Sequence, residues 1–198
     1  NVIRLVSDSY DEIVISLDDI ILKEEEKETT TALIKGVVSG FLNRKFQVGG
    51  FKAYVTSDVL IGAGLSSSAA FETLIGTILS GLYNNMSVSA IDIAIIGQYA
   101  ENIYFGKPCG LMDQMARSVG NLVYIDFENT SKPIVEKVEF DMEEYGYSLC
   151  ITDTKGSHAD LTDEYAAVPR EMKQVAKHFG KEVLRGITAQ DIIREIQA

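Results

Sequence analysis

A glycine- and serine-rich segment places the strongest constraint on how this chain can fold. It reads Gly-Ala-Gly-Leu-Ser-Ser-Ser-Ala-Ala over residues 62–70, and it joins an apolar stretch at 51–56 to a run of helix-forming residues. Glycine adopts positive φ angles that other residues avoid, so the two glycines permit a tight loop between a strand and a helix. The first N–H groups of that helix lack intrahelical partners and can donate hydrogen bonds to an anion.

Two interpretations of this segment are open. A single serine before a helix is an ordinary N-cap, and glycine-rich turns start many helices that bind nothing. Three consecutive serines, at 66, 67 and 68, supply more hydroxyls than a cap needs. In other phosphate-binding loops such hydroxyls contact phosphate oxygens or Mg²⁺. The segment lacks the Gly-Lys-Ser/Thr ending of a Walker loop, so the pattern predicts a phosphate site of another kind or a plain helix start.

The composition limits the class of protein. The chain has 198 residues, 46% of them hydrophobic, and a formal net charge of −11, which indicates a globular protein with one substantial core. The negative charge argues against a nucleic-acid or anionic-membrane partner, and no apolar run reaches the roughly 18 residues of a membrane span. The two cysteines and two histidines lack metal-ligand spacing. We therefore expect a reduced, cytoplasmic protein without a zinc site or a Ser/His/Asp hydrolase site.

Hydrophobic periodicity predicts strands and helices mixed along the chain. Strands are expected at 2–6, 12–17, 51–56, 121–127, 133–140 and 147–152. Helices are expected from a cap at Thr30 or Thr31 to about Arg44, over 66–82, from Ser87 or Ser89 to Tyr104, over 111–119, and from about Leu161 to Gly180. Pro169 is expected to break the last helix or to stand in a new first turn. The mixture predicts an α+β fold with a domain boundary near 141–146.

A second group of residues combines Glu101 with Gly-Lys-Pro-Cys-Gly-Leu-Met-Asp-Gln at 106–114. Asp113 falls in the first turn of a predicted helix, where the helix dipole stabilises a carboxylate by about 0.3–1 kcal/mol, so ordinary capping would account for it. Glu101 lies near the end of the preceding helix, where the dipole disfavours an acid. A bound Mg²⁺ would remove that conflict, and exposure to solvent would weaken it.

The two segments together resemble the signatures of a known family. Residues 62–70 and 108–114 closely resemble two signatures of the galactokinase family, in the GHMP small-molecule kinase superfamily, and the second signature is the narrower one. Segments 163–172 and 179–185 look like the stretch that follows the first strand of the second domain in that family. The segments occur in family order, so the resemblance covers essentially the whole chain.

The resemblance implies the α+β fold of the GHMP kinases. Residues 1–145 would form part of an N-terminal, ATP-binding domain, in which helices pack on a mixed sheet in a two-layer sandwich like that of ribosomal proteins. Residues 146–198 would begin a second α+β domain. The family's arginine-bearing N-terminal motif and its C-terminal glycine-rich motif have no counterpart in these 198 residues. We therefore expect an internal piece of the family sequence that is inactive by itself.

The resemblance also implies an activity, the ATP-dependent phosphorylation of the anomeric hydroxyl of α-D-galactose to give galactose 1-phosphate and ADP, with Mg²⁺ as cofactor. The triphosphate would be held by the loop residues Gly62, Ala63, Gly64, Leu65, Ser66, Ser67 and Ser68. Ser68 and Glu101 match the positions that hold Mg²⁺ in the family. Asp113 matches the catalytic aspartate, and Gly110 and Tyr165 match positions that contact the sugar.

Two other functions are compatible with the same residues. One is a kinase for another sugar such as N-acetylgalactosamine, against which the narrower match at 108–114 argues. The other is a non-catalytic sensor that binds galactose and ATP, and the intact Ser68, Glu101 and Asp113 argue against it. The sequence does not distinguish a general base at Asp113 from a residue that only orients the sugar hydroxyl. It carries no signal for oligomeric state.

Overall fold

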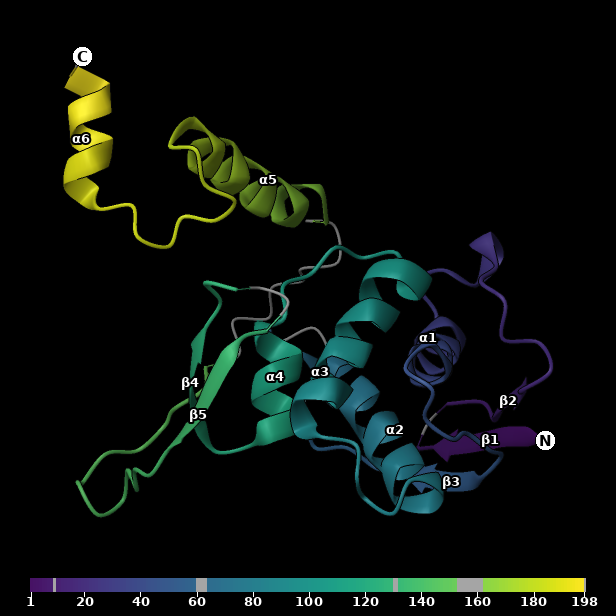
Figure 1. The fold of residues 1–198 in the computed structure, drawn as a ribbon. Helices are drawn as coiled ribbons and strands as arrows, with labels where there is room; N and C mark the ends of the chain where they lie inside the picture. Colours follow the sequence, from purple (N-terminus) through teal and green to yellow (C-terminus); the bar gives the residue numbers. More distant parts are fainter. Residues whose placement is uncertain (9, 60–63, 130–131, 153–161, 198) are drawn as a thin grey trace.

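A three-stranded sheet and the helices that cover one of its faces form the main body of the molecule (Figure 1). The computed structural model describes residues 1–8, 10–59, 64–129, 132–152 and 162–197. The sheet has the order β2-β1-β3, with β1 at Val2–Ser7, β2 at Ile13–Ser16 and β3 at Lys52–Val55. β1 runs antiparallel to β2 and parallel to β3. The sheet is therefore mixed, and its three strands are those predicted.

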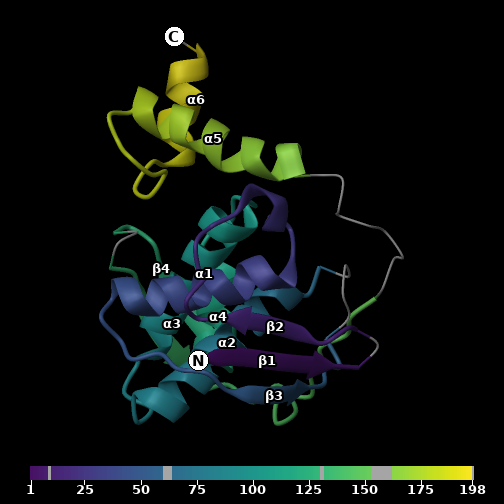
Figure 2. The same cartoon turned by 90° about the vertical axis from the view of Figure 1, so that its right-hand side faces the viewer.

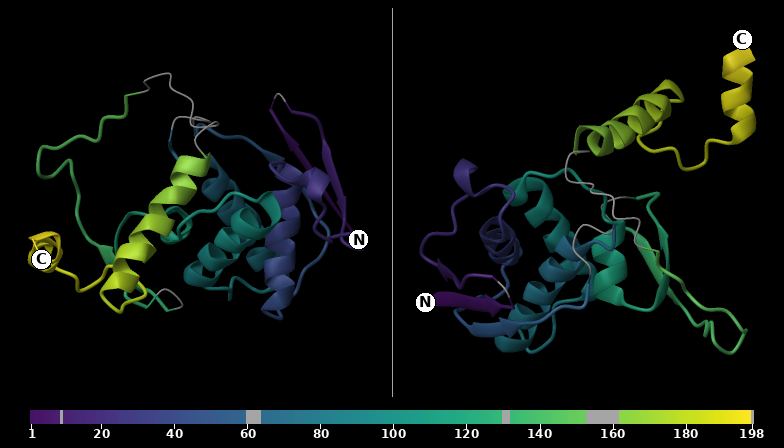
Figure 3. Two further views of the ribbon diagram at one scale, coloured as in Figure 1. Left: turned by 90° about the horizontal axis from the view of Figure 1, so that it is seen from above. Right: turned by 180° about the vertical axis from the view of Figure 1, so that it is seen from behind.

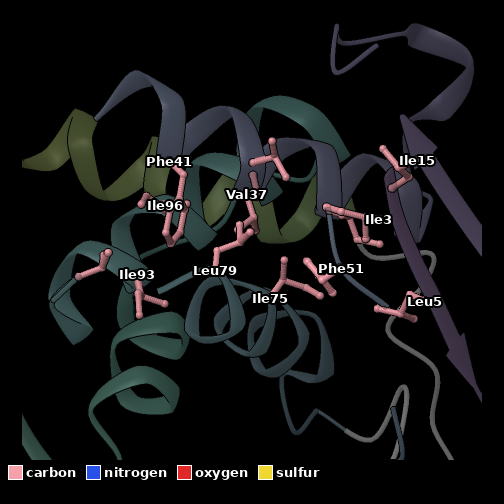
Figure 4. Close-up of a cluster of buried hydrophobic side chains, with 14 residues drawn as sticks. Ile3, Leu5, Ile15, Val37, Phe41, Phe51, Ile75, Leu79, Ile93 and Ile96 are labelled. Atoms are coloured by element: carbon pink, nitrogen blue, oxygen red, sulfur yellow. The ribbon is translucent and has the colours of Figure 1, made fainter. Parts of the chain in front are cut away.

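Side-chain alternation decides which face of the sheet is buried. Ile3 and Leu5 of β1 and Ile15 of β2 are buried, whereas Arg4 and Val14 are exposed. Three helices pack on the buried face: α1 (Thr30–Asn43), α2 (Ser67–Tyr83) and α3 (Ala90–Tyr99). In Figure 2, which faces the sheet, α2 and α3 lie behind the strands. Figure 4 shows the core between them, to which the helices contribute Val37, Phe41, Ile75, Leu79, Ile93 and Ile96.

The first and third helices begin at capping hydroxyls. Thr29 accepts a hydrogen bond from the main-chain N–H three residues later, at 3.3 Å, and Ser89 makes the equivalent bond at 3.0 Å. Ser89 was one of the two predicted starts. The predicted cap at Thr30 or Thr31 is wrong, because both residues already lie inside α1 and Thr29 is the last residue with extended backbone angles.

The helix that starts with α3 continues with a different winding. Residues Ala100–Phe105 form a π-helical turn, η2, in which the N–H of Gly106 donates to the carbonyl of Glu101 at 3.0 Å. The sequence predicted one helix as far as Tyr104, and the structure confirms its extent but not its α winding. Gly106 ends the turn with a φ of +88°, an angle that favours glycine.

Two glycines of α1 let this helix approach its neighbours closely. A Cβ added at Gly36 would lie 2.7 Å from both Cα and Cβ of Ala100, at the start of η2. A Cβ at Gly40 would lie 2.7 Å from Cγ2 of Ile96 in α3. These distances are shorter than side-chain contacts allow, so the helix spacing depends on both glycines.

A helix and a hairpin form a second, smaller layer. Helix α4 (Met112–Val119) is followed by the antiparallel strands β4 (Leu122–Asp126) and β5 (Ile134–Val138), as predicted. The buried side chains Ala94, Leu111 and Met115 join the hairpin to α3 and α4, and Ile125 and Val135 of the hairpin pack against them.

The C-terminal helices stand apart from this body (Figure 3). They are α5 (Thr162–His178) and α6 (Ala189–Gln197), and an ion pair of 2.9 Å between Arg185 and Asp126 links the segment between them to the end of β4. Pro169 lies inside α5, so the predicted break is wrong. Residues 163–165 in the preceding turn are exposed, so water can replace the one main-chain hydrogen bond that proline cannot donate. No helix in the described ranges is long and apolar enough to cross a membrane.

The predicted strand at 147–152 is also wrong. These residues have no strand conformation, and Tyr147, Leu149 and Ile151 are exposed. Their alternation fits a strand, but a strand needs a partner for its N–H and carbonyl groups, and the described residues pair none with this segment. The division of the chain near residue 146 stays a prediction.

Replacing Gly36 with alanine should destabilise the fold. The added methyl group would overlap the backbone and Cβ of Ala100, which cannot move without shifting η2, and overpacking of this kind costs about 1–3 kcal/mol. Urea denaturation measures the loss. Gly110→Ala is the matched control, because nothing lies within 4 Å of an added Cβ there; equal stability of the two variants would contradict the prediction.

Candidate active site

The N-terminus of α2 has no hydrogen bond from a capping side chain. Ser66 occupies the N-cap position with left-handed backbone angles, φ 51° and ψ 54°, and its side chain does not cap the helix. Gly64, two residues earlier, also has a positive φ of +72°. The first N–H groups of α2 therefore receive no side-chain cap from the described residues and can meet an anion. Gly62 and Ala63 of the predicted loop lie outside the described residues.

Helix α4 contacts this loop at two adjacent residues. The hydroxyl of Ser66 donates to Oδ2 of Asp113 at 2.5 Å, which explains why it does not cap α2. One turn further along α4, Nη2 of Arg117 donates to the carbonyl of Leu65. Sequence analysis missed Arg117, although its spacing of four residues from Asp113 placed the two side chains on one helix face.

The structure brings Ser68 and Glu101 together. The Ser68 hydroxyl donates to Oε1 of Glu101 at 3.0 Å, and Glu101 is only 4% exposed. Glu101 belongs to the first turn of η2, so the wide turn carries this carboxylate toward the start of α2. The sequence left two explanations for an acid near the unfavourable end of a helix dipole, a bound Mg²⁺ or exposure to solvent. The burial of Glu101 excludes exposure to solvent.

Two buried residues of this group were missed from the sequence. Gln114 donates from Nε2 to Oε2 of Glu101 at 2.7 Å and to Oε2 of Glu72 at 3.2 Å. Burial, reinforced by the negative charge of Glu101, raises the pKa of Glu72 to about 8, so this carboxyl keeps its proton at neutral pH. Glu72 follows Ser68 by four residues on α2, and that spacing could have revealed it.

The segment before α4 is held by amide side chains. The N–H of Cys109 donates to Oδ1 of Asn102 at 2.6 Å, and its carbonyl accepts from Gln98 at 3.2 Å. Burial raises the pKa of the Cys109 thiol to about 12, which keeps it protonated. Gly110 follows on an open side, and Tyr165 lies exposed on α5, outside the elements that form this group.

The donor atoms suit a hard cation that is completed by a ligand. The Ser68 hydroxyl and the Glu101 carboxylate offer oxygen, which Mg²⁺ prefers, and Mg²⁺ is usually bound by one or two carboxylates together with phosphates and water. In the part of the chain that the structure describes, no three His, Cys, Asp or Glu side chains cluster as an ion site. An ion here would therefore depend on oxygens supplied by a bound phosphate.

The part of the sequence that carries these residues matches a known domain. Residues 32–121 match the GHMP kinases N terminal domain, and this range includes the start of α2, Glu101 and Asp113. Over this range the chain is similar to the N-terminal domain of the GHMP kinases.

Its curated relatives include galactokinases. The galactokinase of Pyrococcus furiosus is 31% identical over 159 residues, 80% of this chain and 44% of that protein. The enzyme of Thermotoga petrophila is 32% identical over 172 residues, 87% of this chain and 48% of that protein. That of Actinobacillus pleuropneumoniae is 37% identical over 153 residues, which make up 73% of this chain and 37% of that protein. This chain spans less than half the length of these relatives.

The fold also has a solved counterpart. Lactococcus lactis galactokinase, complexed with galactose, matches 98% of this chain and 50% of its own with a TM-score of 0.73, at 21% identity. This likeness confirms the expected fold class, an α+β architecture of the GHMP-kinase type.

The protonation of Glu72 predicts how stability depends on pH. Between about pH 4.5, where the unfolded carboxyl ionises, and about pH 8, the folded protein holds a proton that the unfolded chain has released. Stability should therefore fall as the pH rises through this interval, by at most about 1–2 kcal/mol per pH unit. Glu72→Gln removes the titrating group, so its stability relative to wild type should rise with pH in urea denaturation. The exposed Glu136→Gln is the control; parallel curves for Glu72→Gln and wild type would disprove the assignment.

Proposed function

We propose that this protein transfers the γ-phosphate of ATP to the anomeric hydroxyl of galactose, with Mg²⁺ as cofactor. The observation that carries the proposal is the meeting of two segments at the start of α2: Ser68 contacts Glu101, and Ser66 contacts Asp113. A phosphate-binding helix start, an oxygen pair suited to Mg²⁺ and a carboxylate thus lie within reach of one another. The galactokinase relatives favour galactose as the acceptor over N-acetylgalactosamine.

The loop and the start of α2 bind the triphosphate in this proposal. The N–H groups at the helix start and the positive end of its dipole attract an anion. Residues 62–68 are the proposed phosphate-binding loop, and the Arg117 guanidinium beside Leu65 adds positive charge at its described part. In a protein with a net charge of −11, these local donors supply the attraction for a nucleotide.

Ser68 and Glu101 hold the metal ion that accompanies the nucleotide. A Mg²⁺ ion bound by these two side chains would supply positive charge that offsets the charge developing during transfer. The side chains keep the two oxygen ligands in place, because Oε1 of Glu101 already points at the Ser68 hydroxyl. Burial of Glu101 strengthens its interaction with a cation, since few water molecules screen it.

Asp113 accepts the hydrogen bond of the sugar hydroxyl that attacks the phosphate. The Ser66 hydroxyl fixes Oδ2 of Asp113, and this bond orients the carboxylate relative to the loop. Gly110 and Tyr165 are the proposed sugar contacts. We also propose that residues 1–145 belong to the ATP-binding domain and 146–198 to the start of a second domain, which contributes Tyr165 from α5.

Turnover tests the reaction. Protein made from the complete reading frame should release ADP only when galactose is present, and N-acetylgalactosamine should replace galactose poorly. Asp113→Asn should lower kcat by at least about 100-fold, the contribution of a positioned acid–base group, while ATP binding stays near wild type. A variant as active as wild type would refute the role of Asp113, and binding of ATP and galactose without turnover would identify a sensor instead.

Metal binding can be tested separately from turnover. Ser68→Ala and Glu101→Gln should weaken ATP binding in MgCl₂ much more than in EDTA, because the first removes an oxygen ligand of the ion and the second replaces a charged carboxylate with a neutral amide. Calorimetric titration measures both affinities. Ser80→Ala, on the same helix but far along it, is the matched control and should leave the magnesium effect unchanged. Equal affinities for all four proteins in MgCl₂ would contradict the assigned metal ligands.

A further inference from the structure

Two successive residues of α4, Asp113 and Gln114, lie in different surroundings. Asp113 is exposed and meets the Ser66 hydroxyl at the loop. Gln114 is only 1% exposed and bonds to side chains of α2 and η2. The step of about 100° between successive helix residues turns one side chain outward and the next inward. The contacts of Gln114 therefore need an explanation that is separate from that of Asp113.

The amide of Gln114 holds one end of the Glu101 carboxylate. Its nitrogen donates to Oε2 of Glu101 at 2.7 Å, while the Ser68 hydroxyl donates to Oε1 at 3.0 Å. Each carboxylate oxygen thus has its own donor, and rotation of the group would break at least one bond. The same nitrogen lies 3.2 Å from Oε2 of Glu72 and 3.5 Å from Cys109 Sγ, and its second hydrogen serves the nearer of these, Glu72.

A neutral amide suits this position. An amide nitrogen donates two hydrogen bonds without adding charge, so it can bridge two buried acids. An ionised carboxylate in its place would donate none, and would add a third acid to the cluster. Gly97 of α3 leaves room for the bridge, because a Cβ there would lie 3.1 Å from Oε2 of Glu72 and 3.2 Å from Cγ of Gln114.

We propose that Gln114 is a positioning residue, which sets the orientation in which Glu101 binds Mg²⁺ together with ATP. The proposal rests on the function proposed above and adds a residue that acts through Glu101, without contact to nucleotide or sugar. Removing a hydrogen bond that orients a metal ligand typically lowers metal affinity 10- to 100-fold. The same loss is expected here, confined to binding that depends on the metal.

Gln114→Met tests the proposal, because methionine has a similar length and no donor. Calorimetric titration with ATP should show an affinity about 10- to 100-fold weaker than wild type in MgCl₂ and little change in EDTA. Gln98→Met is the matched control. It also removes a partly buried amide, which donates to the Cys109 carbonyl at 3.2 Å and does not contact Glu101, so its magnesium effect should equal that of wild type.

Each remaining outcome is decisive. A folded Gln114→Met variant with the wild-type magnesium effect overturns the proposal, and so does an equal loss in MgCl₂ and EDTA, which indicates a purely structural role. If Gln114→Met does not fold, Gly97→Ala decides, because its methyl group would press on Glu72 Oε2 and Gln114 Cγ, at 3.1 and 3.2 Å, without removing a polar group; it should weaken binding in MgCl₂ selectively. If wild type binds ATP without any magnesium effect, the proposed function fails as well, whereas the other results reject the role of Gln114 alone.

Discussion

The contact between α1 and η2 is the constraint on which the site depends. Gly36 leaves no room for a Cβ above Ala100, and Ala100 immediately precedes Glu101. Ala100 therefore packs directly against α1, and the side chain of the following residue, Glu101, points toward the start of α2. A polar site of this kind needs such support, since a carboxylate held by two hydrogen bonds is useful only if the backbones that carry its donors stay in register.

The sequence predicted most of the elements because its patterns are local. Alternation in β1 and β2 and the serine start of α3 need no knowledge of the rest of the chain. The π winding of η2 could not be predicted, because Glu101 through Phe105 have ordinary helical side chains and the winding shows only in the backbone hydrogen bonds. The strand predicted at 147–152 was wrong because the alternation of its side chains is a local pattern, whereas a strand also needs a neighbouring strand to pair with.

The candidate site was predictable in part for the same reason. The loop and the segment around Asp113 are contiguous motifs, so the sequence identified them, whereas the Glu72–Gln114 bridge forms only when three helices pack. Gly97 packs closely against Glu72, since an added Cβ would lie 3.1 Å from its Oε2, and no motif singles this glycine out. Sequence spacing can place side chains on one helix face, but which face becomes buried is decided by neighbours that are distant in the chain.

The winding of η2 also restricts how this region can change in length. A π turn holds about one residue more than an α turn, so losing one residue would let the segment rewind as an ordinary helix. The chain before and after the turn would keep roughly its orientation, because six π residues turn about as far as five α residues, but positions within the turn, Glu101 and Asn102 among them, would move relative to Ser68 and the Cys109 backbone. The extra residue of the turn therefore helps to set where the Glu101 carboxylate lies, although no side chain of the turn's second half enters the site.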